Sequence, residues 1–169
     1  TEVRELDPAS GEYVRLAQFN PAEEDAPEAY AEKRQAQDTQ YSIEIAEGVT
    51  SWQVMTALNG LEILDGDVSD VPDEGSLAPD SYAVSPGDDP AELVTRMQEA
   101  QSRLLADAWA TRADGLPMET PEEALILASI VEKETGGYDE VRIVASVFEN
   151  RLNAGMRLQT DPTVIYGIT

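Results

Sequence analysis

Glu134 is the residue of this sequence whose position most favours acid–base chemistry. It completes a series of residues at helical spacing that share one stripe of a predicted helix: Leu127, Ile130, Val131 and Glu134. We therefore expect the stripe to carry the Glu134 carboxylate into the core or into the wall of a cleft. One helical turn before Glu132 lie Ala128 and Ser129, so Glu132 does not extend a stripe of large apolar residues.

Two effects are expected to raise the pKa of the Glu134 carboxyl. Burial disfavours the charged form, and the negative end of the helix dipole acts on a carboxylate in the last turn. A raised pKa suits a general acid near neutral pH. The ammonium of Lys133 would oppose this shift if it came close. A glutamate at a helix end is commonly just solvated or ion-paired, and spacing alone leaves both interpretations open.

Further polar residues that suit a site follow within one short stretch of the chain: Asn150, Gln159, Asp161, Thr163 and Tyr166. Each also has a structural interpretation. Asp161 fits a helix N-cap, Asn150 fits a surface position on a helix, and Tyr166 fits the core with its hydroxyl at the edge.

The helix that positions Glu134 has clear boundaries. Thr120, Pro121 and Glu123 match an N-cap, a first-turn proline and a capping-box acid. The body over 124–131 is almost entirely apolar, which predicts a buried helix. Gly136 and Gly137 end it. A second helix is predicted from about 139 to 153, with an apolar face that packs inward: Val141, Val144, Phe148 and Leu152. Asp161-Pro162 predicts the start of a further helical turn.

The segments upstream predict a smaller α/β unit and a long helix. Residues 41–45 alternate large and polar side chains, which predicts a strand, and Thr50 or Ser51 then caps a short helix ending at Gly60. This strand requires a partner strand. Residues 64–90 are rich in Asp, Gly, Pro and Ser and are expected to be loop. An amphipathic helix is predicted from Pro90 to the region of Gly115.

The first forty residues differ in character from the rest. Residues 1–40 are polar and acidic, and we interpret most of them as a linker or an insertion, with a short polar helix over 28–37. The predicted organisation is therefore 1–40 linker or insertion, 41–88 strand–helix subdomain and loop, and 89–169 a mainly helical part.

The composition excludes several kinds of chemistry. The 169 residues include no cysteine and no histidine, so disulfides, thiolate nucleophiles, Ser-His-Asp triads and histidine metal sites are impossible. The net charge of −23 argues against nucleic acid and anionic membrane surfaces as ligands. We interpret the acidity as a means of solubility rather than as a surface for a cationic partner. No run of about 18 apolar residues is present, so any membrane anchor must lie outside this chain.

Three segments resemble the catalytic region of the MltG-type (YceG-like) endolytic murein transglycosylases. They are Ile130–Thr135 (IVEKET), Val144–Leu152 (VASVFENRL) and Gly155–Gly167 (GMRLQTDPTVIYG). Weaker matches lie at 112–117 and 74–82, where Ser81 replaces a threonine of the family pattern. The resemblance covers about 41–169, and the small strand–helix subdomain is similar to the LysM-like subdomain of that family.

The resemblance implies an α+β fold with a LysM-like subdomain followed by a mainly helical catalytic subdomain, truncated at its C-terminal side. It places the catalytic glutamate at Glu134, not Glu132, and cleft-lining residues at Asn150, Gln159, Asp161 and Tyr166. It implies peptidoglycan glycan strands as substrate, peptidoglycan synthases as partners and no cofactor. Its members are anchored in the inner membrane by one span and face the periplasm.

Three other interpretations stay open from the sequence. Asp161 would provide the second carboxylate that most glycosidases use, so the product distinguishes a hydrolase from a transglycosylase. The segment around 41–85 would bind peptidoglycan without cutting it. A pyridoxal-phosphate lyase needs a Schiff-base lysine, for which only Lys33 and Lys133 exist, and no glycine-rich phosphate loop is visible. A purely structural acidic protein is disfavoured by the density of motifs over 130–167.

Overall fold

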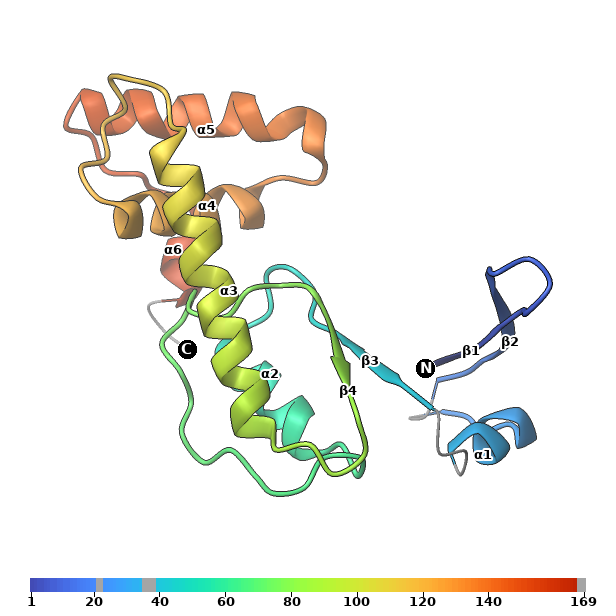
Figure 1. Cartoon of the computed structure of the whole chain (residues 1–169). Helices are drawn as coiled ribbons and strands as arrows, with labels where there is room; N and C mark the ends of the chain where they lie inside the picture. Colours follow the sequence, from blue (N-terminus) through green and yellow to red (C-terminus); the bar gives the residue numbers. More distant parts are fainter. Residues whose placement is uncertain (21–22, 35–38, 167–169) are drawn as a thin grey trace. The chain divides into compact units, whose positions relative to one another are not determined.

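The computed structural model describes residues 1–20, 23–34 and 39–166 (Figure 1). The chain forms two compact units: residues 1–41 with 83–85, and residues 42–82 with 86–169. Helices and small two-stranded sheets are both present, which agrees with the predicted α+β class. The boundary predicted near residue 88 stays a prediction. Within the described residues, no helix has the length and apolar character needed to cross a membrane.

The first unit is built on a β-hairpin that the sequence did not predict. β1 (Glu2–Leu6) pairs antiparallel with β2 (Tyr13–Gln18), with a register shift between Val3 and Arg4. The strands are largely exposed, so they lack the alternation of buried and exposed positions that would have revealed them. The predicted polar helix is present as α1 (Glu28–Arg34) within the described residues. The ring of Phe19, which is buried, contacts Tyr30 edge-on at 5.1 Å between centroids.

The strand predicted over 41–45 is present as β3 (Tyr41–Glu44), and its partner is β4 (Ser81–Val84). The expectation that residues 64–90 are entirely loop is therefore wrong. β4 alternates exposed and buried residues, but it is only four residues long, and the prolines, glycines and acids around it hide that alternation. The Tyr82 hydroxyl donates to the Ala78 carbonyl oxygen at 2.8 Å, inside the protein.

Two predicted helices lie in the second unit. α2 (Ser51–Asn59) begins after Thr50, where Thr50 and Gln53 complete a reciprocal capping box. α3 (Pro90–Ala110) begins after the N-cap Asp89. Its buried residues lie in the first half, among them Leu93, Val94 and Met97, whereas Leu104 in the second half is 56% exposed. The C-terminal half of α3 therefore extends beyond the buried part of the unit.

The remaining helices form a small cluster around one apolar core. α4 (Pro121–Glu134) and α5 (Tyr138–Asn153) pack against each other, and α6 (Asp161–Tyr166) contacts α4 (Figure 1). The buried residues of this core are Leu127, Ile130, Val131 and Phe148. Ile126 is 63% exposed, so the prediction that α4 is buried on all sides is wrong. One stripe of α4 packs, and the opposite face remains in solvent.

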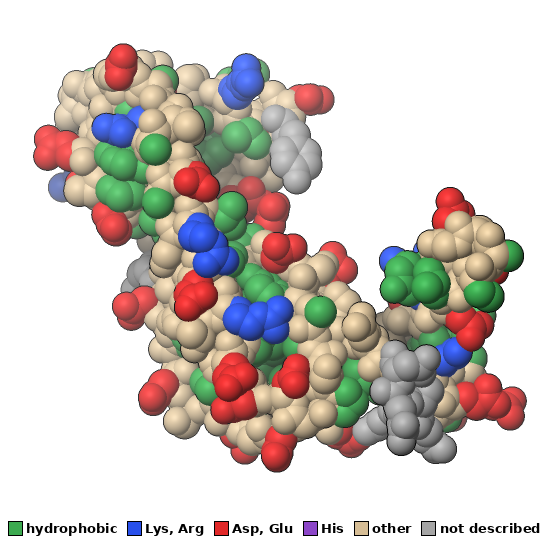
Figure 2. Space-filling model, in the orientation of Figure 1, with side chains coloured by type: hydrophobic (Ala, Val, Ile, Leu, Met, Phe, Trp, Pro, Cys, Tyr) green, Lys and Arg blue, Asp and Glu red, His purple; other side chains and the backbone are tan. Residues whose placement is uncertain are grey.

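Acidic side chains dominate the surface. On the face drawn in Figure 2 they are spread across the molecule and interspersed with a few basic groups, rather than gathered into one patch. This distribution agrees with the interpretation of the charge as a general solubilising property.

Candidate active site

The local structure of α4 places Glu134 at the final position of the helix. The Thr120 hydroxyl accepts from the Glu123 N–H at 3.2 Å, and Pro121 opens the first turn, as the sequence predicts. The Glu123 carboxylate accepts from the Glu119 N–H at 2.7 Å, so the reciprocal half of the box is displaced by one residue. After Glu134 the chain leaves the helix at Thr135, whose backbone is extended.

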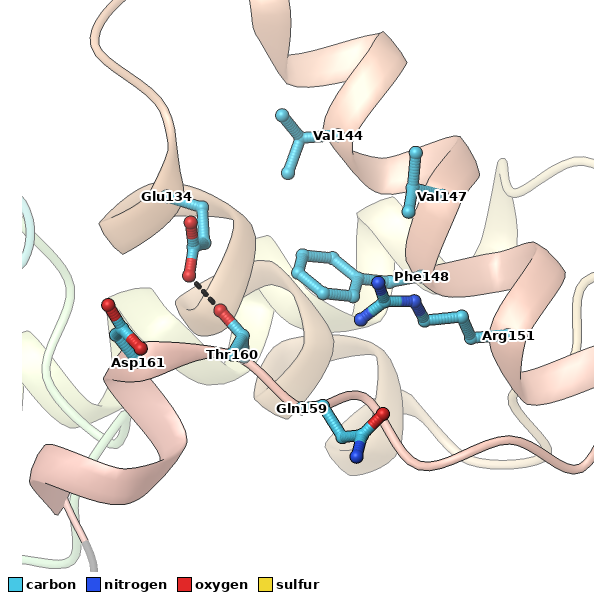
Figure 3. A pocket seen from close by; sticks show the side chains of 8 residues that line it. All are labelled: Glu134, Val144, Val147, Phe148, Arg151, Gln159, Thr160 and Asp161. Atoms are coloured by element: carbon cyan, nitrogen blue, oxygen red, sulfur yellow. Dashed lines mark hydrogen bonds between the residues drawn. The ribbon is translucent and has the colours of Figure 1, made fainter.

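Glu134 lines a pocket between α4, α5 and the segment that leads into α6. The pocket has a volume of about 360 Å³, within the range of roughly 300–1,000 Å³ typical of small-ligand sites. Its lining residues are Glu134, Val144, Val147, Phe148, Arg151, Gln159, Thr160 and Asp161 (Figure 3). Apolar side chains of α5 and polar side chains of the 159–161 segment thus lie around one open pocket with a carboxylate of α4.

The Thr160 side chain holds the Glu134 carboxylate in this pocket. Its hydroxyl donates a hydrogen bond to Oε1 of Glu134 (Figure 3). Thr160 is only 8% exposed, so its own orientation is constrained by packing. Its carbonyl oxygen accepts from the Thr163 hydroxyl at 2.7 Å, which ties it to the first turn of α6. No local sequence pattern singles out Thr160 as a site residue.

Of the two places expected for the Glu134 carboxylate, the structure shows the wall of a cleft, because Glu134 lines the pocket. Burial in the core is wrong, because the residue is exposed although the rest of its stripe is buried. Leu127, Ile130 and Val131 continue into the core, whereas the helix ends at Glu134 and the side chain emerges at the open side of the pocket. The carboxylate is therefore accessible from solvent.

The Lys133 side chain contacts a segment that is distant in the sequence. Its ammonium donates to the carbonyl oxygen of Gly48 at 2.7 Å, which lies 85 residues earlier in the chain. Lys133 and Glu134 therefore make contacts with different segments, and the ammonium is engaged at the Gly48 turn.

Arg151 fixes the segment that carries Thr160. Its guanidinium donates to the Leu158 carbonyl oxygen and lies 6.0 Å from the centroid of the Phe148 ring. The next residue, Gln159, has a positive φ of 50°, which is unusual for a residue with a side chain. Nothing in the local sequence pattern shows that a carbonyl seven residues later receives the Arg151 guanidinium.

Of the five site residues that the family resemblance implies, the structure brings three together. Glu134, Gln159 and Asp161 line the same pocket. Asn150 is exposed on α5 and is not among the described residues that line it. Tyr166 ends α6, but its side chain lies outside the described part of the structure.

A family model and similar curated proteins agree on one family. A sequence model of the YceG-like family matches residues 9–169. An endolytic murein transglycosylase of Streptococcus pneumoniae is 33% identical over 94 residues, which is 55% of this chain and 16% of that protein. An endolytic murein transglycosylase of Bacillus subtilis is 32% identical over 95 residues, which is 56% of this chain and 26% of that protein. The matched segments thus span about a sixth to a quarter of the length of these curated relatives.

Proposed function

This chain belongs to the YceG-like family, and we propose that it provides the acid–base centre of an endolytic murein transglycosylase. The observation that carries the proposal is the Glu134 carboxylate, exposed in a pocket and held by the buried Thr160. The names of the relatives from Streptococcus pneumoniae and Bacillus subtilis support peptidoglycan as the substrate class.

In the proposed reaction one carboxyl group serves both proton transfers. Protonated Glu134 donates its proton to the oxygen that links MurNAc C1 to the next GlcNAc, and the C1–O bond breaks. The ionised Glu134 then takes the proton of the MurNAc C6 hydroxyl, whose oxygen bonds to C1. The products are a 1,6-anhydroMurNAc end and a free GlcNAc hydroxyl, and no water is consumed. The exposed position of Glu134 suits both steps, because each requires a substrate oxygen within hydrogen-bond reach.

Asp161 and Gln159 are proposed to bind the glycan beside the bond that breaks, since both line the pocket. Asn150 would contact only a strand that continues past the pocket along α5. Tyr166 is proposed to contact the glycan as well, as the family resemblance implies. The substrate requires the site to face the exterior of the cytoplasmic membrane, because peptidoglycan lies there, and synthases that make the same polymer are the proposed partners.

The test is digestion of purified peptidoglycan by the full-length protein and its Glu134→Gln variant, with products identified by mass spectrometry. We expect anhydro-ended fragments from the wild type and at least a roughly hundredfold lower rate from the variant, because a general acid–base group contributes about 10²–10⁴. Glu132→Gln is the matched control, because Glu132 is exposed on the same helix and lies outside the pocket lining.

Three other results of this digestion would contradict the proposal. Equal activity of wild type and Glu134→Gln would move the chemistry to another residue. Reducing ends in place of anhydro ends would show a hydrolase and turn attention to Asp161 as a second carboxylate. Binding of sacculi without any cleavage would favour the peptidoglycan-binding module.

A further inference from the structure

Two glycine turns of the second unit contact α4, one near its middle and one at its end. A Cβ added at Gly75 would lie 3.0 Å from Cδ2 of Leu125, and one at Gly48 would lie 3.2 Å from Nζ of Lys133. Both glycines have left-handed φ values, +78° and +72°, which residues with a side chain rarely adopt. The backbone conformation of each turn therefore favours glycine, whereas the flexible ends of the Leu125 and Lys133 side chains can shift away from an added methyl group.

The two turns are also joined to each other at the start of α2. The Ser51 N–H donates to both carboxylate oxygens of Glu74, at 3.2 and 3.0 Å, and the Ser51 hydroxyl donates to the Asp73 carbonyl oxygen at 3.3 Å. Ser51 is 3% exposed. The Gly48 turn, α2 and the Gly75 turn consequently form one connected support for α4.

The contact at the end of α4 is directed and polar. The Lys133 ammonium donates to the Gly48 carbonyl oxygen at 2.7 Å, and Lys133 immediately precedes Glu134. The end of α4 is also capped from within the helix, because the Thr135 N–H and hydroxyl both donate to the Val131 carbonyl oxygen, at 3.1 and 3.0 Å. These bonds are local and tie the end of α4 to no other segment, and the chain continues from them through Gly136 and Gly137. Thr160 restrains the Glu134 side chain, but a backbone that frays at this end would move the carboxylate away from it.

We propose that Lys133 is a positioning residue, which fixes the last turn of α4 to the Gly48 turn and so sets the position of the Glu134 carboxylate in the pocket. The catalytic part of this inference rests on the proposed function. Lys133 does not line the pocket, and its action on the reaction is through the backbone that it shares with Glu134. The strand–helix segment would then serve to align the acid–base residue, independently of any binding of glycan.

The test compares Lys133→Met, which keeps the length of the side chain and removes the ammonium, with Lys133→Arg, which keeps a charged donor. We expect kcat of Lys133→Met to fall about three- to tenfold with KM little changed. Water competes for an exposed hydrogen bond, so a larger loss is not expected. Lys133→Arg should recover most of kcat. Lys33→Met is the matched control, because it removes the same charge from α1.

A second variant probes the same contact from the other side. Gly48→Ala places a methyl group against the Lys133 ammonium and strains the turn. If both residues act through one contact, the kcat of the double variant Gly48→Ala/Lys133→Met should be little lower than that of the more impaired single variant. Fully additive losses would overturn the shared contact.

Hydrogen–deuterium exchange of the same variants separates this inference from the proposed function. We expect the amides of 131–135 and 47–50 to exchange several-fold faster in Lys133→Met than in the wild type, while those of α3 stay unchanged. An inactive wild type would refute the proposed function, and exchange would still decide whether the contact holds the helix end. Unchanged exchange would overturn the contact, and faster exchange with unchanged kcat would overturn its positioning role.

Discussion

The hydroxyl of Thr160 donates a hydrogen bond to Oε1 of Glu134, across 26 residues of sequence. The donor is buried and the acceptor is exposed, so the protein holds one oxygen of the carboxylate and leaves the group accessible from the pocket. This arrangement suits a residue that must meet two different substrate oxygens in succession.

Removing this hydroxyl should slow the reaction without altering substrate affinity. In Thr160→Val the shape is nearly kept, and we expect kcat to fall about ten- to hundredfold, since a hydrogen bond to a charged group contributes about 1.5–3 kcal/mol. Thr160→Ser, which retains the hydroxyl, should keep most of kcat. Initial rates of anhydro-product release measure both. Equal rates for the two variants would contradict a role for the hydrogen bond.

Gln159 should be a site of local backbone strain. Its φ of +50° lies in the left-handed region, where a side chain costs about 1 kcal/mol or more. The free energy of unfolding of Gln159→Gly should therefore be about 1 kcal/mol higher than that of Gln159→Ala, although both variants lack the side-chain amide. Both variants should lose activity if the amide contacts the glycan. Urea denaturation compares the two, and a less stable glycine variant would show that the strain is absent.

Phe148 should be the main contributor to the core under the site. It is 4% exposed and packs with Leu127, Ile130 and Val131, so Phe148→Ala should lower the free energy of unfolding by about 3–5 kcal/mol. Ile143→Ala, on the same helix but 66% exposed, should change it by less than about 0.5 kcal/mol. Chemical denaturation followed by circular dichroism distinguishes the two. Similar losses would place the core elsewhere.

The β1–β2 hairpin should lose stability in acid. Hydrogen bonds from Arg4, at 2.7 Å, and Arg15, at 2.5 Å, lower the pKa of Glu2 from 4.5 to about 2. In the unfolded chain the Glu2 carboxyl has the higher pKa, so as the pH falls it takes up a proton before the folded form does. The contribution is therefore complete above pH 4.5 and is lost as the pH falls toward 2.

Amide exchange of the hairpin between these pH values measures the effect, and Glu2→Gln should remove the part that belongs to Glu2. A smaller dependence should remain in that variant, because a hydrogen bond from the Ala9 N–H also lowers the pKa of Asp7. An unchanged pH dependence in Glu2→Gln would contradict the assignment.

Local pattern was sufficient to predict most helices. Thr120 and Pro121 specify where α4 begins, and the apolar spacing of α5 specifies most of its inner face; both signals act within a few residues of the chain. Val141, Val144 and Phe148 pack as predicted, whereas Leu152, predicted on the same face, is 37% exposed. The same reasoning failed for β1 and β2, whose residues are mostly exposed. It also failed for β4, whose alternation is only four residues long. A strand is stabilised by its partner, and a short or exposed strand leaves little trace in its own sequence.

The sequence by itself determined that catalysis by this chain must rest on Asp, Glu, Lys, Tyr, Ser or Thr, because the chain has neither histidine nor cysteine, and it placed Glu134 at the end of an apolar stripe. Only the tertiary structure decided that Glu134 is exposed, that Thr160 holds its carboxylate and that Lys133 turns to Gly48. Helical spacing fixes which residues share a face, but the depth of a side chain and its partners depend on segments 26 and 85 residues away. Those distant contacts form only when the whole chain packs, so no local pattern encodes them.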